Sequence, residues 1–189
     1  LTLAGGIAKQ VLARRGIAIG AHLAQVGGCA DLLYDPANLD EETLLRPGNA
    51  PFPTLDERLG ARMQRVIEQA RMEQDSVGGM VECGVLGFPP GIGSPMFGGL
   101  ENRIPPLAFG IPAVKGVEFG DGFLACALRG SQNNDPFALK DGQIVTETNH
   151  AGGILGGIST GMPILFRVGF KPTPSISLPQ KTVNFREKR

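Results

Sequence analysis

Glycine and proline together make up 43 of the 189 residues, 28 and 15 respectively. This is about double their combined share of roughly 12% in average proteins. Because glycine reaches backbone angles that other residues avoid and proline fixes φ, such a chain needs many turns and special backbone positions. Collagen-like and disordered chains are excluded, since 42% of the residues are hydrophobic and only 19% are charged. We therefore expect one folded domain over residues 1–189.

Charge and cysteine content limit which molecules the chain can be expected to bind and in which cell compartment it is expected. The 18 basic residues balance 18 acidic ones, so the chain lacks the broad positive field that favours nucleic-acid binding. Three cysteines without a CxxC spacing or a nearby pair of histidines predict no metal site and a reducing, cytoplasmic location. No apolar run approaches the roughly 18 residues of a membrane span, and no signal-peptide pattern is visible, so we expect no membrane partner.

The first residue is Leu1 rather than methionine, and the sequence opens inside an apparent helix. We therefore expect that the beginning of a longer polypeptide is missing.

Hydrophobic periodicity predicts a mixture of strands and helices, which is an α+β fold. Strands are expected over residues 17–26, 77–86, 114–119 and 164–170, the last half-buried, and a hairpin over 137–148 around Asp141-Gly142. A helix is expected over 3–15 with Gly16 as its C-cap, and a second from a capping box at Thr54–Glu57 to Glu73. Residues 31–53 suggest a loop, and 87–95 a rigid turn. Pro105 and Pro106 predict a broken helix within 100–109.

The glycine-rich segment from Thr148 to Ser159 is the first candidate for chemistry. Its glycines would let a ligand approach main-chain NH groups, while Asn149 and His150 would supply directional donors. A phosphate or a planar ring is a suitable ligand. The same glycines also fit a corner where backbone segments cross closely, and the segment matches neither the P-loop nor the dinucleotide fingerprint.

A second candidate is the segment Lys171-Pro-Thr-Pro-Ser175, in which two prolines fix the backbone between an ammonium and a hydroxyl. Phosphate suits this pair, although a solvated lysine before a proline-rich turn is the alternative. The polar run Gly130–Asp135 is ambiguous in the same way, because Asn and Asp are common in loops.

His22 fits a structural histidine in a strand better than a catalytic base, which makes His150 the better candidate for chemistry. Glu82 and Glu118 are interpreted as partnered structural residues, since no spacing makes them converge.

Several motifs resemble chorismate synthase, in that family's order and over nearly the whole chain. The matching segments are Asp75–Gly79, Gly87–Gly93, Ile111–Phe123, Gly130–Asp135, Thr148–Ser159, Lys171–Ile176 and Pro179–Val183. Leu1–Ile7 is similar to the tail of the family's Ser-Ala-Arg-x-Thr segment. Pro105-Pro106 departs from the helix-compatible residues usual in the family at that place.

The resemblance implies a layered β-α-β sandwich, here incomplete, from a homotetrameric enzyme. That enzyme converts 5-enolpyruvylshikimate 3-phosphate to chorismate and phosphate, in a 1,4-anti elimination that requires reduced FMN. By the same resemblance the loop Asn149, His150, Ala151 and Gly152 would bind the flavin, and Lys171 with Ser175 would hold its phosphate. Ser131, Asn134 and Asp135 would lie near the cofactor, contributed across the tetramer.

Other family motifs are absent from this sequence, namely the Gly-Glu-Ser-His-Gly segment, a second histidine, the arginines for the substrate phosphate and the late Arg-x-Asp motif. The catalytic residues are therefore unknown within this chain, which is expected to be inactive alone. The alternative is a non-catalytic core that self-associates and binds flavin weakly or not at all.

Overall fold

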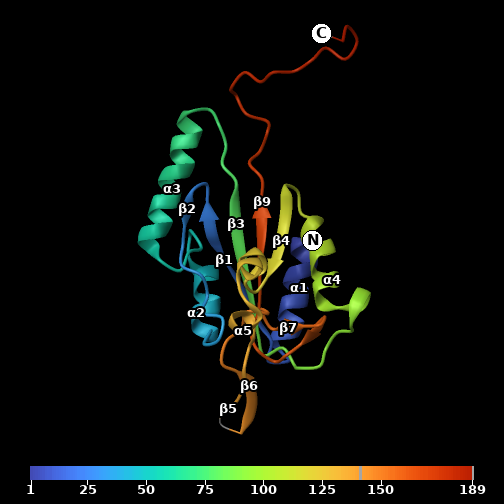
Figure 1. The fold of residues 1–189 in the computed structure, drawn as a ribbon. Coiled ribbons are helices and arrows are strands. Elements are labelled where there is room, and N and C mark those ends of the chain that lie inside the picture. Colours follow the sequence, from blue (N-terminus) through green and yellow to red (C-terminus); the bar gives the residue numbers. More distant parts are fainter. Residues whose placement is uncertain (141, 189) are drawn as a thin grey trace.

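The computed structural model describes residues 1–140 and 142–188, and its centre is a five-stranded antiparallel sheet (Figure 1). The strand order is β2-β1-β3-β9-β4. The bounds are Ala18–Val26 for β1, Cys29–Ala30 for β2, Gly79–Leu86 for β3, Val114–Phe119 for β4 and Ile164–Phe170 for β9. All four long strands agree with the sequence prediction. Most of β9 is buried rather than half-buried, because it lies between β3 and β4 and is covered on both faces.

The N-terminal helix and the strand after it follow the predicted pattern. Helix α1 spans Thr2–Ala13, and Gly16 lies beyond it with a φ of +76°, the left-handed angle of a helix-ending glycine. The antiparallel pair of β1 and β3 contains one irregularity between Leu23 and Gln25. Gly27 then turns the chain into β2 with a φ of +55°.

Helix α3 spans Glu57–Met72, so the second predicted helix is confirmed, but its cap differs from the prediction. Asp56 is the N-cap, and its carboxylate accepts from the backbone NH groups of Arg58 and Leu59. Thr54 is buried instead, with its hydroxyl against Gly60. A short carboxylate two residues closer to the helix satisfies the orphan donors directly, so the predicted Thr54 capping box is wrong.

Helix α4 runs unbroken over Leu100–Phe109 with both prolines inside it, so the predicted break is wrong. Proline removes an NH donor but keeps its carbonyl, and the carbonyl of Pro106 accepts from the Gly110 NH at 3.2 Å. One face of the helix packs on the sheet through buried Ala108. This tertiary packing outweighs the two missing donors.

Residues 31–53 are not only loop. They contain helix α2 (Glu41–Leu45), capped by Asp40, and the 3-10 helix η1 (Arg46–Asn49). The predicted rigid turn at 87–95 precedes a second 3-10 helix, η2 (Met96–Gly98), and a third, η3 (Gly122–Ala127), precedes the short helix α5 (Gly130–Asn133).

Two small antiparallel hairpins complete the fold. One is formed by β5 (Phe137–Lys140) and β6 (Gln143–Thr146), as predicted; Gly142 in its turn has a φ of +77°, whereas Asp141 lies outside the described residues. The other is formed by β7 (Ile154–Leu155) and β8 (Ile158–Ser159). Its two-residue turn is Gly156-Gly157, and both glycines have positive φ.

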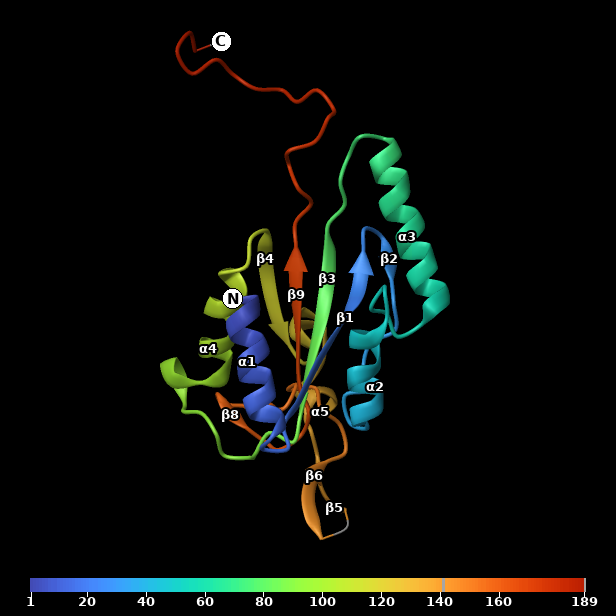
Figure 2. The same cartoon turned by 180° about the vertical axis from the view of Figure 1, so that it is seen from behind.

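Helices cover both faces of the sheet (Figures 1 and 2). Leu44 of α2 packs with Leu165 of β9, whereas Ala108 of α4 packs with Val168 of the same strand. Because residues three apart in a strand point to opposite faces, α2 and α4 lie on opposite sides. The α+β class is confirmed, with one large sheet in the described part of the chain. None of the described helices is long and apolar enough to cross a membrane.

Candidate functional site

A row of ionisable side chains crosses one face of the sheet. His22, Glu82, Arg167 and Glu118 occupy matching positions on the four neighbouring strands β1, β3, β9 and β4. His22, Glu82 and Arg167 are buried. Buried charges are stable only when paired, so the partners of this row decide whether it is structural or reactive.

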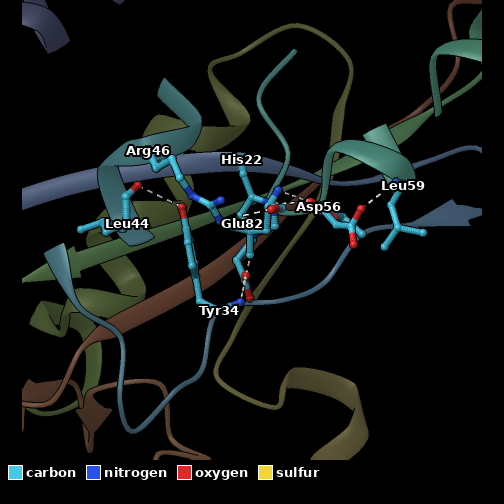
Figure 3. Close-up of polar contacts among 9 residues, drawn as sticks. His22, Tyr34, Leu44, Arg46, Asp56, Leu59 and Glu82 are labelled. Carbon is cyan, nitrogen blue, oxygen red and sulfur yellow. Dashed lines mark hydrogen bonds and ion pairs between the residues drawn. The ribbon is translucent and has the colours of Figure 1, made fainter. Parts of the chain in front are cut away.

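On the β1 side of the row, His22 is buried between two carboxylates (Figure 3). His22 Nε2 lies 2.9 Å from Glu82 Oε2, and His22 Nδ1 lies 3.4 Å from Asp31 Oδ2. The same Glu82 oxygen accepts from the backbone NH of Tyr34 at 2.8 Å. Burial, with Glu82 adding, raises the pKa of the Tyr34 hydroxyl. The interpretation of His22 and Glu82 as partnered structural residues is confirmed.

The β4 side of the row supports a turn. Arg167 Nε lies 2.8 Å from Glu118 Oε1, and Arg167 also donates to the carbonyl of Gly120 at 2.7 Å. The other oxygen of Glu118 accepts from the NH of Phe123 at 3.2 Å. The Arg167–Glu118 pair therefore fixes the turn that presents Asp121, and Glu118 is structural as predicted.

Asp121 and His150 form a second acid–histidine pair, closer to solvent. The carboxylate lies 2.7 Å from His150 Nδ1, and their side chains are 30% and 26% exposed. The Asp121 NH also donates to the His150 carbonyl at 2.8 Å. The second ring nitrogen of His150 makes no hydrogen bond to any of the described residues, and the His150 side chain is partly exposed, unlike that of His22.

Most of the predicted glycine loop serves packing. A Cβ on Gly120 would overlap the carbonyl of His150, and one on Gly153 would overlap that of Pro163. The buried Asn149 donates both amide hydrogens, to the carbonyls of Pro36 and Pro163, and its side-chain oxygen accepts from the Gly153 NH. The alternative of a close backbone crossing therefore holds for these residues, and Asn149 fixes the loop from inside.

Asp135 ties the polar run 130–135 to the same loop. Its carboxylate accepts from the NH groups of His150 and Ala151 and from the Thr148 hydroxyl, at 2.7, 3.0 and 2.7 Å. A hollow of about 300 Å³ lies beside this contact, lined by residues that include Asn134, Asp135, Asn149 and Ala151. These four predicted residues are thus brought together. Ser131 and His150 do not line the hollow.

Gly156 is a loop residue that the sequence pattern did not single out as a site residue. It is exposed, its φ is +61°, and a Cβ there would meet no atom within 4 Å. The hairpin turn accounts for its angle, but the open space leaves its backbone accessible. The Gly-Gly pair between Ile154-Leu155 and Ile158-Ser159 is the sequence signal that predicts such a turn.

Lys171 and Ser175 are exposed just beyond the end of β9. Neither the Lys171 ammonium nor the Ser175 hydroxyl makes a hydrogen bond or ion pair with any residue of 1–140 and 142–188. The backbone beneath is fixed, since the Lys171 NH donates to the Ala113 carbonyl at 2.9 Å and the Thr173 carbonyl accepts from Ser76. Ala113 has a φ of +72°, a left-handed angle that is unusual for a residue other than glycine. Sequence patterns gave no signal for that angle.

The two predicted parts of the site lie at opposite ends of β9. The Leu165 NH, at the start of the strand, donates to the Gly152 carbonyl, whereas Lys171 follows its last residue. Six residue steps of about 3.3 Å separate the strand ends by about 20 Å. The structure therefore does not bring Lys171 and Ser175 together with Asn149–Gly152 within one copy of the chain.

Comparison with known proteins decides the family. The chorismate synthase family model matches residues 1–189. The chain belongs to the chorismate synthase family. Chorismate synthases from Lancefieldella parvula and Thermococcus kodakarensis are 45% and 49% identical to it, over 98% and 97% of the chain. A crystal structure of chorismate synthase has a TM-score of 0.81 at 31% identity, and the match covers 89% of this chain.

The chain spans about half the length of these chorismate synthases, 52% and 50% of the two sequences and 53% of the crystallised chain. Family and fold are thus established by sequence and by structure.

Proposed function

We propose that this chain is part of an enzyme that eliminates phosphate from 5-enolpyruvylshikimate 3-phosphate to form chorismate, with reduced FMN as cofactor. Membership of the chorismate synthase family supports the reaction, which belongs to the pathway of aromatic amino-acid synthesis. The observation that carries the proposal within this chain is the pair of free donors at Lys171 and Ser175. We also propose a cytoplasmic homotetramer as the working form.

The Lys171 ammonium and the Ser175 hydroxyl beyond the end of β9 are suitable donors for the phosphate of FMN. A lysine ammonium is a compact cation, and a phosphate oxygen is its ordinary partner. Pro172 and Pro174 restrict the backbone between the two donors, so that less freedom is lost when both bind one anion. Lys171 and Ser175 would hold the phosphate here, beside the fixed carbonyl of Ala113.

When bound, reduced FMN would supply electron density for the loss of the substrate phosphate, and the protein would position the cofactor. In this chain the exposed backbone of Gly156 and the hollow beside Ala151 offer surfaces for a planar ring. Asp121 orients His150 through Nδ1, so that the other ring nitrogen is free to hold or accept a proton. Catalytic residues are not assigned within the chain.

Flavin titration tests the proposal. Replacing Lys171→Ala should raise the Kd for FMN about 10- to 100-fold, because a hydrogen bond to a charged group contributes about 1.5–3 kcal/mol. Lys181→Ala, which removes an equally exposed lysine from the C-terminal segment, is the matched control and should leave the Kd unchanged. Fluorescence of FMN measures both. An unchanged Kd for Lys171→Ala would refute the phosphate assignment.

A second candidate function is a non-catalytic core that self-associates. The observation in its favour is that helix α1 buries none of its residues, although Leu3 and Ile7 are 82% and 57% exposed. Exposed apolar faces of this kind mark contacts with other protein surfaces. Absence of measurable FMN affinity in the unmodified chain would favour this candidate over the flavin site.

A further inference from the structure

Two loops flank the chain as it leaves strand β9. Phe170, the last residue of that strand, is paired with the first residues of both β3 and β4. Since both neighbours are antiparallel to β9, the loops that precede them lie on either side of residues 171–177, here called the donor segment (Figures 1 and 2). One is the α3–β3 loop, residues 73–78, and the other is the turn over residues 110–113 before β4.

Each loop accepts a hydrogen bond from the donor segment through the carbonyl of a left-handed residue. The Lys171 NH donates to the Ala113 carbonyl at 2.9 Å, and the Ser177 NH donates to the Gln74 carbonyl at 3.2 Å. The φ angles of Ala113 and Gln74 are +72° and +61°, and only two other described residues besides glycine have a positive φ. Such angles cost free energy in a residue with a side chain and persist only where the surrounding structure enforces them. Both strained carbonyls hold the same segment.

Ser76 makes a third contact, from the middle of the α3–β3 loop. Its hydroxyl donates to the Thr173 carbonyl at 2.7 Å. The backbone also approaches closely here, because a Cβ on Gly78 would overlap the Phe170 carbonyl. The motif Asp75–Gly79, which the proposed site does not otherwise use, therefore lies against the donor segment.

The three contacts fix the backbone on both sides of the free side chains. They act at positions 171, 173 and 177, and the prolines at 172 and 174 restrict φ between them. The Lys171 ammonium and the Ser175 hydroxyl thus extend from a backbone that is already ordered. A segment that is ordered before its ligand arrives loses less conformational entropy on binding.

We propose that Ser76 is a positioning residue for phosphate binding, which holds the donor segment in its binding conformation together with the carbonyls of Gln74 and Ala113. This inference rests on the proposed function, since Lys171 and Ser175 are the donors that Ser76 positions. Ser76 acts through the backbone and not on the ligand. A hydroxyl has one proton, and that of Ser76 is donated to the Thr173 carbonyl, so none is left for a phosphate oxygen.

Amide hydrogen exchange tests the positioning without any ligand. Ser76→Ala removes the donor to Thr173, so the Ser177 NH should exchange about 3- to 10-fold faster. Ser76→Thr keeps the hydroxyl and should restore the rate. Equal exchange in Ser76→Ala and in the unmodified chain would overturn the proposal.

Ser94→Ala is the matched control for this measurement. Ser94 is also partly buried, and its hydroxyl also donates to a carbonyl, that of Pro95. It belongs to the loop after β3, at the opposite end of β9 from the donor segment. Its substitution should leave the exchange of the Ser177 NH unchanged.

Fluorescence titration with FMN tests the consequence for binding. Ser76→Ala should raise the Kd for FMN about 3- to 10-fold, the effect of one ordinary hydrogen bond, and Ser76→Thr should restore it. A purely structural serine would instead lower the midpoint of urea denaturation and leave the Kd unchanged. That result would overturn the proposal.

The two proposals fail in different ways. If Lys171→Ala weakens FMN binding and Ser76→Ala does not, the phosphate site stands and the positioning role is refuted. If Ser76→Ala speeds exchange in the donor segment while Lys171→Ala leaves the Kd unchanged, the phosphate assignment fails, and the role of Ser76 in phosphate binding fails with it.

Discussion

The two ends of strand β9 carry similar polar residues, but their side chains differ in whether they have hydrogen-bond partners within the chain. At the Ile164 end, Asn149, Asp135 and the glycines are saturated by contacts within the chain. At the Phe170 end, Lys171 and Ser175 have fixed backbones and free side chains. A polar, glycine-rich motif therefore identifies a ligand site only where its donors are left without partners. The comparison supports a structural role for Asn149 and Asp135 at the first end and the proposed phosphate site of Lys171 and Ser175 at the second.

Gly120→Ala should have the largest effect, because it disrupts the saturated end. The new Cβ would overlap the His150 carbonyl at a residue with a φ of +54°. We expect a loss of about 4 kcal/mol or more in the free energy of unfolding, measured by urea denaturation. Gly116→Ala, four residues earlier with ordinary φ and open space, should change it by less than about 1 kcal/mol. Equal effects would contradict the close crossing.

Arg167→Met should have the next largest effect. The substitution leaves the partly buried Glu118 without its cation and removes the donor to the Gly120 carbonyl. We therefore expect the free energy of unfolding to fall by about 2–3 kcal/mol in urea denaturation. Adding Glu118→Leu should recover part of that loss. Arg71→Met breaks an exposed pair with Glu68 and should leave the midpoint of denaturation unchanged.

Alkaline pH should lower the free energy of unfolding through Cys83. Burial, with Glu82 adding, raises the pKa of Cys83 from 9.0 to about 12. Between these values the unfolded thiol ionises and the folded one does not, so the stability that is present below pH 9 falls as pH rises toward 12. At pH 8, alkylation followed by mass spectrometry should therefore modify exposed Cys126 and spare Cys83. Equal labelling would contradict the burial.

The long strands could be predicted because their apolar residues have a local period. Helix α4 and the cap of α3 could not, because packing through Ala108 and the choice of Asp56 over Thr54 depend on tertiary contacts. The order of the motifs predicted the family, which the family model confirms. It could not show that antiparallel β9 separates Lys171 from Gly152, or that Ala113 takes a left-handed angle beneath Lys171.

Competition by inorganic phosphate tests the central claim that the free donors at the Phe170 end of β9 bind phosphate. Inorganic phosphate should displace FMN from the unmodified chain, and Lys171→Ala should weaken that competition at least 10-fold, because a hydrogen bond to a charged group is lost. Equal competition by phosphate in the two chains would contradict the claim.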